Sequence, residues 1–166
     1  MRTLTIFFIS LFSLPLVLNA QSVDEMLQKV SAAIEAGQNG QAVSYFRQTI
    51  ALNIDRTEMY YWTNVDKNSE ISSKLATELA LAYKEKRNYD KAYLFYKELL
   101  QKDPNNVDCL EACAEMQVCR GQEKDALRMY EKILQLEADN LAANIFLGNY
   151  YYLTAEQEKK KLETDY

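Results

Sequence analysis

Small and large apolar residues recur along this chain at helical spacing, and the pattern itself repeats. Residues 73–106 align with residues 107–140 at an offset of 34. The identical pairs are Ala80 with Ala114, Ala92 with Ala126, Tyr96 with Tyr130, Leu100-Gln101 with Leu134-Gln135, and Asn106 with Asn140. Apolar positions spaced by three and four residues indicate amphipathic helices. Each unit is therefore predicted to be built from amphipathic helices.

Two further units extend this pattern. One starts at Leu141 and contains Leu147-Gly148-x-x-Tyr151. An earlier and weaker one starts near Val23, with Val30, Ala33, Ala42 and Phe46 at the same positions. One such unit cannot bury its own apolar face, so several must stack. We predict units at about 22–56, 73–106, 107–140 and 141–166, with an insertion at about 57–72.

The repeated residues resemble those of the tetratricopeptide repeat family, whose pattern is W-x2-L-G-x2-Y, then A-x3-F, then P. The unit 73–106 has these residues at family spacing: Leu79-Ala80, Tyr83, Ala92, Tyr96 and Pro104, with Ala76 in place of the tryptophan. In the next unit Gln117 replaces the tyrosine and Ala138 the proline. The resemblance implies an all-α fold, a right-handed superhelix of antiparallel helix pairs with about three and a half repeats. It also implies that the two helices of a pair cross closely at the small residues Ala80 and Ala92, or Ala114 and Ala126.

Glycines and capping residues predict where the helices turn. Gly37 and Gly121 occupy equivalent turns within their pairs, and Arg87 stands in the same position between them. Ser22-x-x-Glu25 and Thr154-x-x-Gln157 match the capping box, which favours a helix start at each. Six of the ten residues in the helix predicted at 155–164 are charged. It is interpreted either as a solvated cap or as part of a unit that continues past Tyr166.

The first twenty residues have the pattern of a secretory signal peptide. Arg2 precedes an apolar stretch from Leu4 to Leu18, and the chain turns polar after Ala20. The alternative is a membrane anchor, but the apolar stretch is shorter than the roughly 20 residues that span a bilayer, and it contains Pro15. We predict cleavage after Ala20 and an exported, periplasmic or secreted, soluble domain at 21–166 that does not insert into the membrane.

Net charge and composition argue against nucleic-acid binding and support an all-α fold. The net charge is −5, and becomes −6 once Arg2 is removed. An acidic chain without a basic stripe lacks the electrostatic footprint of a nucleic-acid-binding protein. Few glycines and prolines among many helix formers agree with an all-α fold.

Catalytic and metal chemistry lack the required residues. The chain has no histidine, so a Ser-His-Asp or Cys-His arrangement cannot form. Cys109, Cys113 and Cys119 are an odd set, and Cys109 and Cys113 are one helical turn apart, a poor geometry for a disulfide. We interpret the three thiols as small packed side chains. The expectation is a protein that is not an enzyme, with no cofactor and no metal.

The resemblance also implies a concave groove lined by the first helix of each pair, which in this family binds extended peptides or helices. By family position the groove residues are Lys74, Thr77, Leu81, Lys84, Asp108, Glu111, Glu115, Val118, Ile145, Asn149 and Tyr152. The groove would change from basic to acidic along its length. The family subclass that clamps a terminal carboxylate is excluded, because Leu27, Ser31 and Asp108 occupy its cationic and amide positions.

The insertion holds an aromatic run, Tyr60, Tyr61 and Trp62. Aromatic side chains are favoured binding anchors, but they also fill joints between helix pairs, which is the interpretation we favour. The predicted function is an extracytoplasmic module that binds a protein or peptide partner in the groove. The alternative is a periplasmic protein that binds a glycan or small molecule through the aromatic run.

Overall fold

The chain folds into eight helices in a computed structural model that describes residues 14–164, with side chains from residue 22 onward. They are α1 (Leu14–Glu35), α2 (Asn39–Leu52), α3 (Ile54–Asn64), α4 (Glu70–Glu85), α5 (Tyr89–Lys102), α6 (Val107–Cys119), α7 (Glu123–Leu136) and α8 (Leu141–Thr164). The described residues contain no strand. The predicted all-α repeat fold is confirmed. Two compact units, Met1–Leu79 and Ala80–Tyr166, divide the chain within α4.

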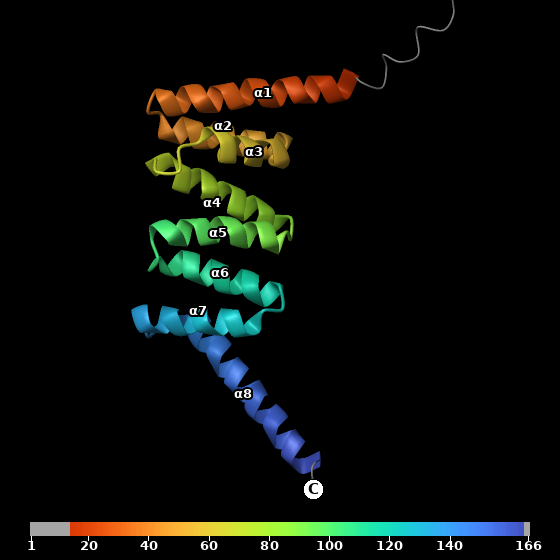
Figure 1. The fold of residues 1–166 in the computed structure, drawn as a ribbon, viewed down its shortest axis with the longest axis vertical. Coiled ribbons are helices and arrows are strands. Elements are labelled where there is room, and N and C mark those ends of the chain that lie inside the picture. Colours follow the sequence, from red (N-terminus) through yellow and green to blue (C-terminus); the bar gives the residue numbers. More distant parts are fainter. Residues whose placement is uncertain (1–13, 165–166) are drawn as a thin grey trace, which may run out of the picture. The chain divides into compact units, whose positions relative to one another are not determined.

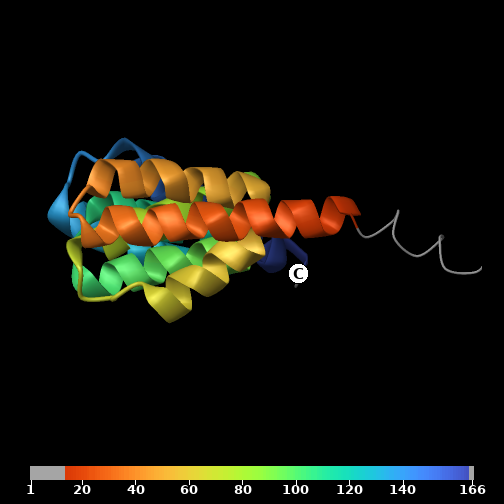
Figure 2. The ribbon, with the colours of Figure 1, turned by 90° about the horizontal axis from the view of Figure 1, so that it is seen from above.

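The first unit contains the predicted first pair, α1 with α2, and α3 lies beside both (Figures 1 and 2). Val30, Ala33, Ala42 and Phe46, the residues that defined this pair in the sequence, are buried. The assignment of the weakest repeat is therefore supported by the packing of its side chains.

The insertion predicted at 57–72 is mostly helix. Asn53 ends α2 and at once caps α3, because its side chain accepts a hydrogen bond from the backbone N–H of Arg56 at 3.0 Å. Helix α3 then runs through residue 64, and α4 begins at Glu70, three residues before the predicted unit start at Ser73. The first helix pair and the insertion thus follow one another without a loop. The spacing of the repeats could not predict this continuity.

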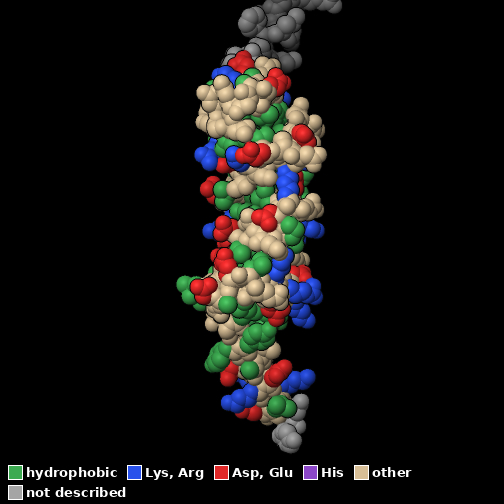
Figure 3. Space-filling view, turned by 90° about the vertical axis from the view of Figure 1, so that its left-hand side faces the viewer, with side chains coloured by type: hydrophobic (Ala, Val, Ile, Leu, Met, Phe, Trp, Pro, Cys, Tyr) green, Lys and Arg blue, Asp and Glu red, His purple; other side chains and the backbone are tan. Residues whose placement is uncertain are grey.

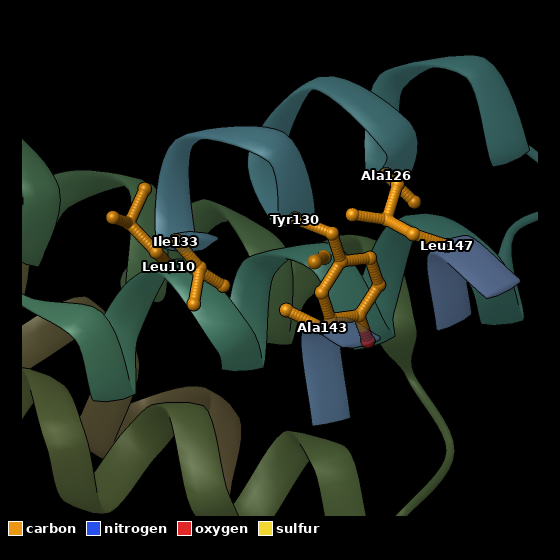
Figure 4. Close-up of a cluster of buried hydrophobic side chains, with 7 residues drawn as sticks. Leu110, Ala126, Tyr130, Ile133, Ala143 and Leu147 are labelled. Atoms are coloured by element: carbon orange, nitrogen blue, oxygen red, sulfur yellow. The ribbon is translucent and has the colours of Figure 1, made fainter. Parts of the chain in front are cut away.

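The second unit stacks α5, α6 and α7 in succession, and α8 packs on α7 (Figure 1). A buried cluster joins α6, α7 and α8 (Figure 4); it consists of Leu110, Ala114, Ala126, Tyr130, Ile133, Ala143 and Leu147. Ala80, Ala92, Ala114 and Ala126 have no exposed surface. This burial agrees with the predicted close crossings at small residues.

Three turns within the helix pairs share one geometry. Gly37, Arg87 and Gly121 have φ angles of 70°, 57° and 72°, in the left-handed region. At each turn the next residue donates its backbone N–H to the carbonyl five residues earlier, at 2.8 to 2.9 Å, as in a Schellman motif. The predicted equivalence of the three turns is confirmed, including the position where arginine replaces glycine.

Helix α8 differs from the prediction. The capping box at Thr154 was expected to open a separate final helix, but α8 is continuous from Leu141 to Thr164. Thr154 Oγ1 instead donates to the carbonyl of Tyr150, at 2.8 Å. Ser22 likewise lies inside α1, which begins at Leu14 in the uncleaved chain. The helix start predicted at Ser22 concerns the mature chain and stays a prediction. Both sequences satisfy a capping pattern, but neither marks a helix end in the uncleaved chain.

Most of the predicted signal peptide lies outside the described residues. Residues 14–20 form the first turns of α1, and residues 1–13 are not described. Among the helices of the described part, none combines the length and the apolar character needed to cross a bilayer.

Candidate binding surface

The groove positions of the second unit lie on the first helices of successive pairs. The end of α4 carries Leu81 and Lys84, α6 carries Asp108, Glu111, Glu115 and Val118, and α8 carries Ile145, Asn149 and Tyr152. All of them are exposed or half-buried. Leu81 is 45% exposed, Ile145 55% and Tyr152 65%.

One ion pair joins two of these helices. Lys84 Nζ lies 2.5 Å from Glu115 Oε2, and both side chains remain partly exposed. The pair shows that the groove positions of α4 and α6 are neighbours at this point. Two of the charges assigned to a partner are therefore already paired with each other, which weakens the predicted change from basic to acidic.

The remaining two groove positions, Lys74 and Thr77, belong to the part of α4 in the first unit. Lys74 is exposed and pairs with Glu70 one turn earlier, at 3.0 Å. Thr77 is half-buried, and its hydroxyl donates to the carbonyl of Ser73 at 2.9 Å. Both side chains have partners within their own helix.

The aromatic run lies on α3, and two of its three rings are core. Tyr61 has no exposed surface, and Tyr60 is 9% exposed with its hydroxyl 2.7 Å from Ser31 Oγ on α1. Burial raises the pKa of Tyr60. The interpretation that these rings fill a joint agrees with this burial. An aromatic binding site would be reduced to Trp62.

Trp62 is 42% exposed and is held at the surface of the first unit. Its ring meets Tyr61 edge-on, with centroids 5.1 Å apart. The ammonium of Lys67 lies 3.9 Å from the Tyr61 centroid and 5.3 Å from the Trp62 centroid. Such cation–π contacts stabilise the loop that follows α3. The indole thus has a structural role, even though part of it remains accessible.

The cysteines divide by position. Cys113 is buried, Cys109 is half-buried and Cys119 is exposed, and all three are free thiols. Burial, reinforced by Cys109, raises the pKa of Cys113 to about 12. The packed-thiol interpretation is confirmed for Cys113 and is wrong for Cys119, which ends α6 on the surface. In the described part of the chain, no cluster of histidine, cysteine or carboxylate side chains could hold a metal ion.

A polar depression of about 520 Å³ near the turns of the second unit escaped the sequence analysis. Its lining includes Lys86, Arg87, Cys119 and Arg120. Arg120 donates to Asp90 Oδ1 at 2.6 Å and to Gln117 Oε1 at 2.7 Å, and it lies over the ring of Tyr93. Arg120 is thus engaged in joining α5 to α6. Apart from Arg87, which the repeat marks as a turn, no repeat position marks these residues, because they lie at helix ends.

Comparison with known proteins agrees with the repeat geometry. The sequence profile of the tetratricopeptide repeat matches residues 75–108, which include α4 from residue 75 onward and all of α5. No curated protein matches the sequence.

Several solved structures are similar over most of the chain, and two of them serve as examples. One is a crystal structure of a candidate protein-binding protein from Bacteroides ovatus, 98% identical, with a TM-score of 0.81. The match covers 87% of this chain and 70% of that one. The other is a mutant of MamA, 16% identical, with a TM-score of 0.51 over 86% of this chain and 91% of that one. The MamA likeness concerns the fold alone.

Proposed function

Since the chain belongs to the tetratricopeptide repeat family, we propose that it is an extracytoplasmic module that binds a protein or peptide partner on the first helices of its pairs. The family supports protein binding in general. The location outside the cytoplasm rests on the pattern of residues 1–20. A scaffold role without catalysis agrees with the absence of histidine from the sequence.

One observation carries the choice of surface. Apolar side chains recur, exposed, on the groove positions of α4, α6 and α8, namely Leu81, Val118, Ile145 and Tyr152. Exposed apolar side chains gathered on one surface are typical of interaction sites. The neighbouring carboxylates Asp108 and Glu111 would set the orientation of a partner, since exposed charge pairs contribute about 1 kcal/mol or less each.

Leu81 and Leu94 provide a matched test of this surface. Leu81 is 45% exposed on a first helix, and Leu94 is 47% exposed on the second helix of the same pair. We expect Leu81→Glu to lose capture of the native partner, because it places a charge where the partner's apolar side chains are desolvated. Leu94→Glu should retain capture. Each variant would be used as bait in its native envelope, and captured proteins would be quantified by mass spectrometry against wild type.

Circular dichroism of both variants provides the folding control. Equal capture by two folded variants would mean that the first helices do not form the binding surface. Quenching of Trp62 fluorescence by glycans, without any protein partner, would instead support the aromatic alternative.

A further inference from the structure

Helix α8 has an apolar face packed on α7 and a second face that nothing in the described chain covers. Ala143 and Leu147 are buried on the packed face, and the Phe146 ring stacks on Tyr130 with centroids 4.4 Å apart. At about 100° per residue, a second stripe lies on another side of the helix. We call it the open face; it consists of Gly148, Tyr151, Ala155 and Leu162, with the charged Glu158 and Lys159 between the last two.

The open face is well exposed. Tyr151 is 53% exposed and Leu162 65%. The Tyr151 hydroxyl donates to Glu131 at 3.0 Å, which positions the ring but leaves it accessible. A methyl group added at Gly148 would have no atom within 4 Å. Hydrophobic side chains are visible at the surface of α8 in the lowest part of Figure 3.

The equivalent positions in the complete pairs are covered. When the 34-residue repeats are aligned, Gly148 corresponds to Ala80 and Ala114, and Tyr151 corresponds to Tyr83 and Gln117. These four are at most 4% exposed. Their cover includes the second helix of their own pair: the Tyr83 ring stacks on Phe95 of α5, with centroids 6.0 Å apart. Residues 148 and 151 therefore have the residue types of a close helix crossing but no second helix.

The C-terminal part of α8 cannot supply that helix. It continues straight through the position of the turn, and it reaches Thr164 without reversing. Lys160 and Thr164 stand where a second helix has Ala92 and Tyr96. A lysine at the crossing position would place a charge between two backbones, at a large desolvation cost.

The similar Bacteroides ovatus protein has enough additional chain for such a helix. The match covers 87% of this chain but only 70% of that protein, so that protein is the longer of the two. The part of it without a counterpart here is longer than one complete helix pair of this chain. The match is 98% identical, so this extra chain belongs to a protein with nearly the same repeats.

We propose that the open face of α8 binds an amphipathic helix from a segment of the native chain that follows Tyr166, and that this helix completes the fourth pair. Gly148 permits close approach of its backbone, as Ala80 and Ala114 do in the complete pairs. Tyr151 and Leu162 are covered by its apolar side chains.

Gly148→Leu tests the proposal through the sign of its effect. It would be made both in the 166-residue chain and in the chain of native length, whose C-terminus is established by intact mass. In the 166-residue chain the leucine meets open space and replaces a helical glycine, so the melting temperature should stay or rise. In the native chain it should clash with the docked helix and lower the melting temperature by about 2–4 °C or more. Gln157→Leu, an exposed change outside the open face, should act alike in both lengths.

Three results would overturn the proposal. A native chain that ends at Tyr166 removes the occupant. An equal effect of Gly148→Leu in both lengths means that no helix covers residue 148. A 166-residue chain that is dimeric by light scattering, and that Gly148→Leu converts to a monomer, assigns the open face to a second copy instead.

Discussion

A single backbone position illustrates how far residue types alone determine this structure. The turn of each helix pair needs one residue with positive φ, which L-residues other than glycine adopt at a cost of about 1–2 kcal/mol. Gly37 and Gly121 meet this need without strain, whereas Arg87 adopts a φ of 57° with a full side chain. The sequence alignment predicted the turn at Arg87 correctly, because it relied on the spacing of the repeat rather than on the residue type, which is unfavourable there.

Arg87→Gly should therefore stabilise the second unit. Removing the side chain relieves the left-handed strain, and the gain is partly offset by the freedom of glycine in the unfolded chain. We expect a net increase of about 0.5–1 kcal/mol in the free energy of unfolding, measured by urea denaturation. Gly121→Ala is the matched control. It should lower stability by about 1 kcal/mol, and through backbone strain alone, since a Cβ there meets no atom within 4 Å. Opposite signs are required; a loss of stability in both variants would contradict the strain at Arg87.

The three cysteines should react in the order of their exposure. Cys119 on the surface should be alkylated first, half-buried Cys109 more slowly, and buried Cys113 only after unfolding. Time-resolved labelling followed by peptide mass spectrometry measures this order. Early labelling of Cys113 in the native protein would contradict its packed environment.

The dependence of stability on alkaline pH tests the burial of Cys113 in a second way. Burial raises the pKa of Cys113 from 9.0 to about 12 and that of Tyr96 from 10.0 to about 12. The folded state favours the protonated forms, so their contribution to stability is complete below pH 9 and is lost as the pH rises towards 12. Urea denaturation between pH 8 and pH 11 should show falling stability for wild type and a shallower fall for Cys113→Ala. Parallel pH profiles would mean that Cys113 does not contribute.

Among the helices, the sequence predicted those that repeat and missed those that do not. The pairs α4–α5 and α6–α7 follow from the recurrent alanines and tyrosines. Helix α3 has no partner in the repeat, so its pattern could not be recognised by comparison with the other units. The turns at Gly37 and Arg87 are farther apart in the sequence than those at Arg87 and Gly121. This excess length detects the insertion but does not predict its conformation.

The capping signal at Thr154 failed for a physical reason. A threonine or serine hydroxyl can cap a helix start, but inside a helix it can equally bond the carbonyl four residues earlier. Thr154 makes that second bond, to Tyr150. The sequence pattern is the same in both cases, so only the continuity of α8 distinguishes them. Asparagines do cap helices in the described part of the chain, for example Asn106 and Asn140, whose side chains accept backbone N–H bonds at 3.0 Å.

Enlarging a small residue at a helix crossing tests the packing of a pair directly. Ala126 on α7 has no exposed surface and belongs to the cluster with Ala114. Ala126→Leu should separate α6 from α7 and lower the free energy of unfolding by about 1–3 kcal/mol. Ala51→Leu, on the exposed face of α2, makes the same chemical change without a crossing and should be nearly neutral. Denaturant unfolding of both variants provides the comparison, and an unchanged Ala126→Leu would contradict the close approach.

At the scale of the whole molecule, charge was the property hardest to predict from sequence. The charges of the groove residues, taken in sequence order, predicted a basic part and an acidic part of the groove. Charged side chains in fact pair across helices: Lys84 with Glu115 and Arg120 with Asp90 in the second unit, and Arg47 with Glu78 in the first. Such pairings depend on side-chain geometry, which a residue count does not contain. The apolar groove positions, by contrast, were predicted to be accessible and are exposed.

Export is the last prediction, and the fold is compatible with it. Val23 is the first buried residue in the described side chains, and Asp24 joins α1 to α3 through Arg56, at 2.5 Å. Cleavage after Ala20 would thus remove none of these contacts. We expect protein recovered from the periplasm or medium of its native host to begin at Gln21, as measured by intact mass. A recombinant chain beginning at Gln21 should fold, whereas one beginning at Val30 lacks Val23 and should lose stability. Recovery from the cytoplasm with Met1 retained would contradict export, and a Gln21 chain that fails to fold would mean that the first turns of α1 belong to the mature domain.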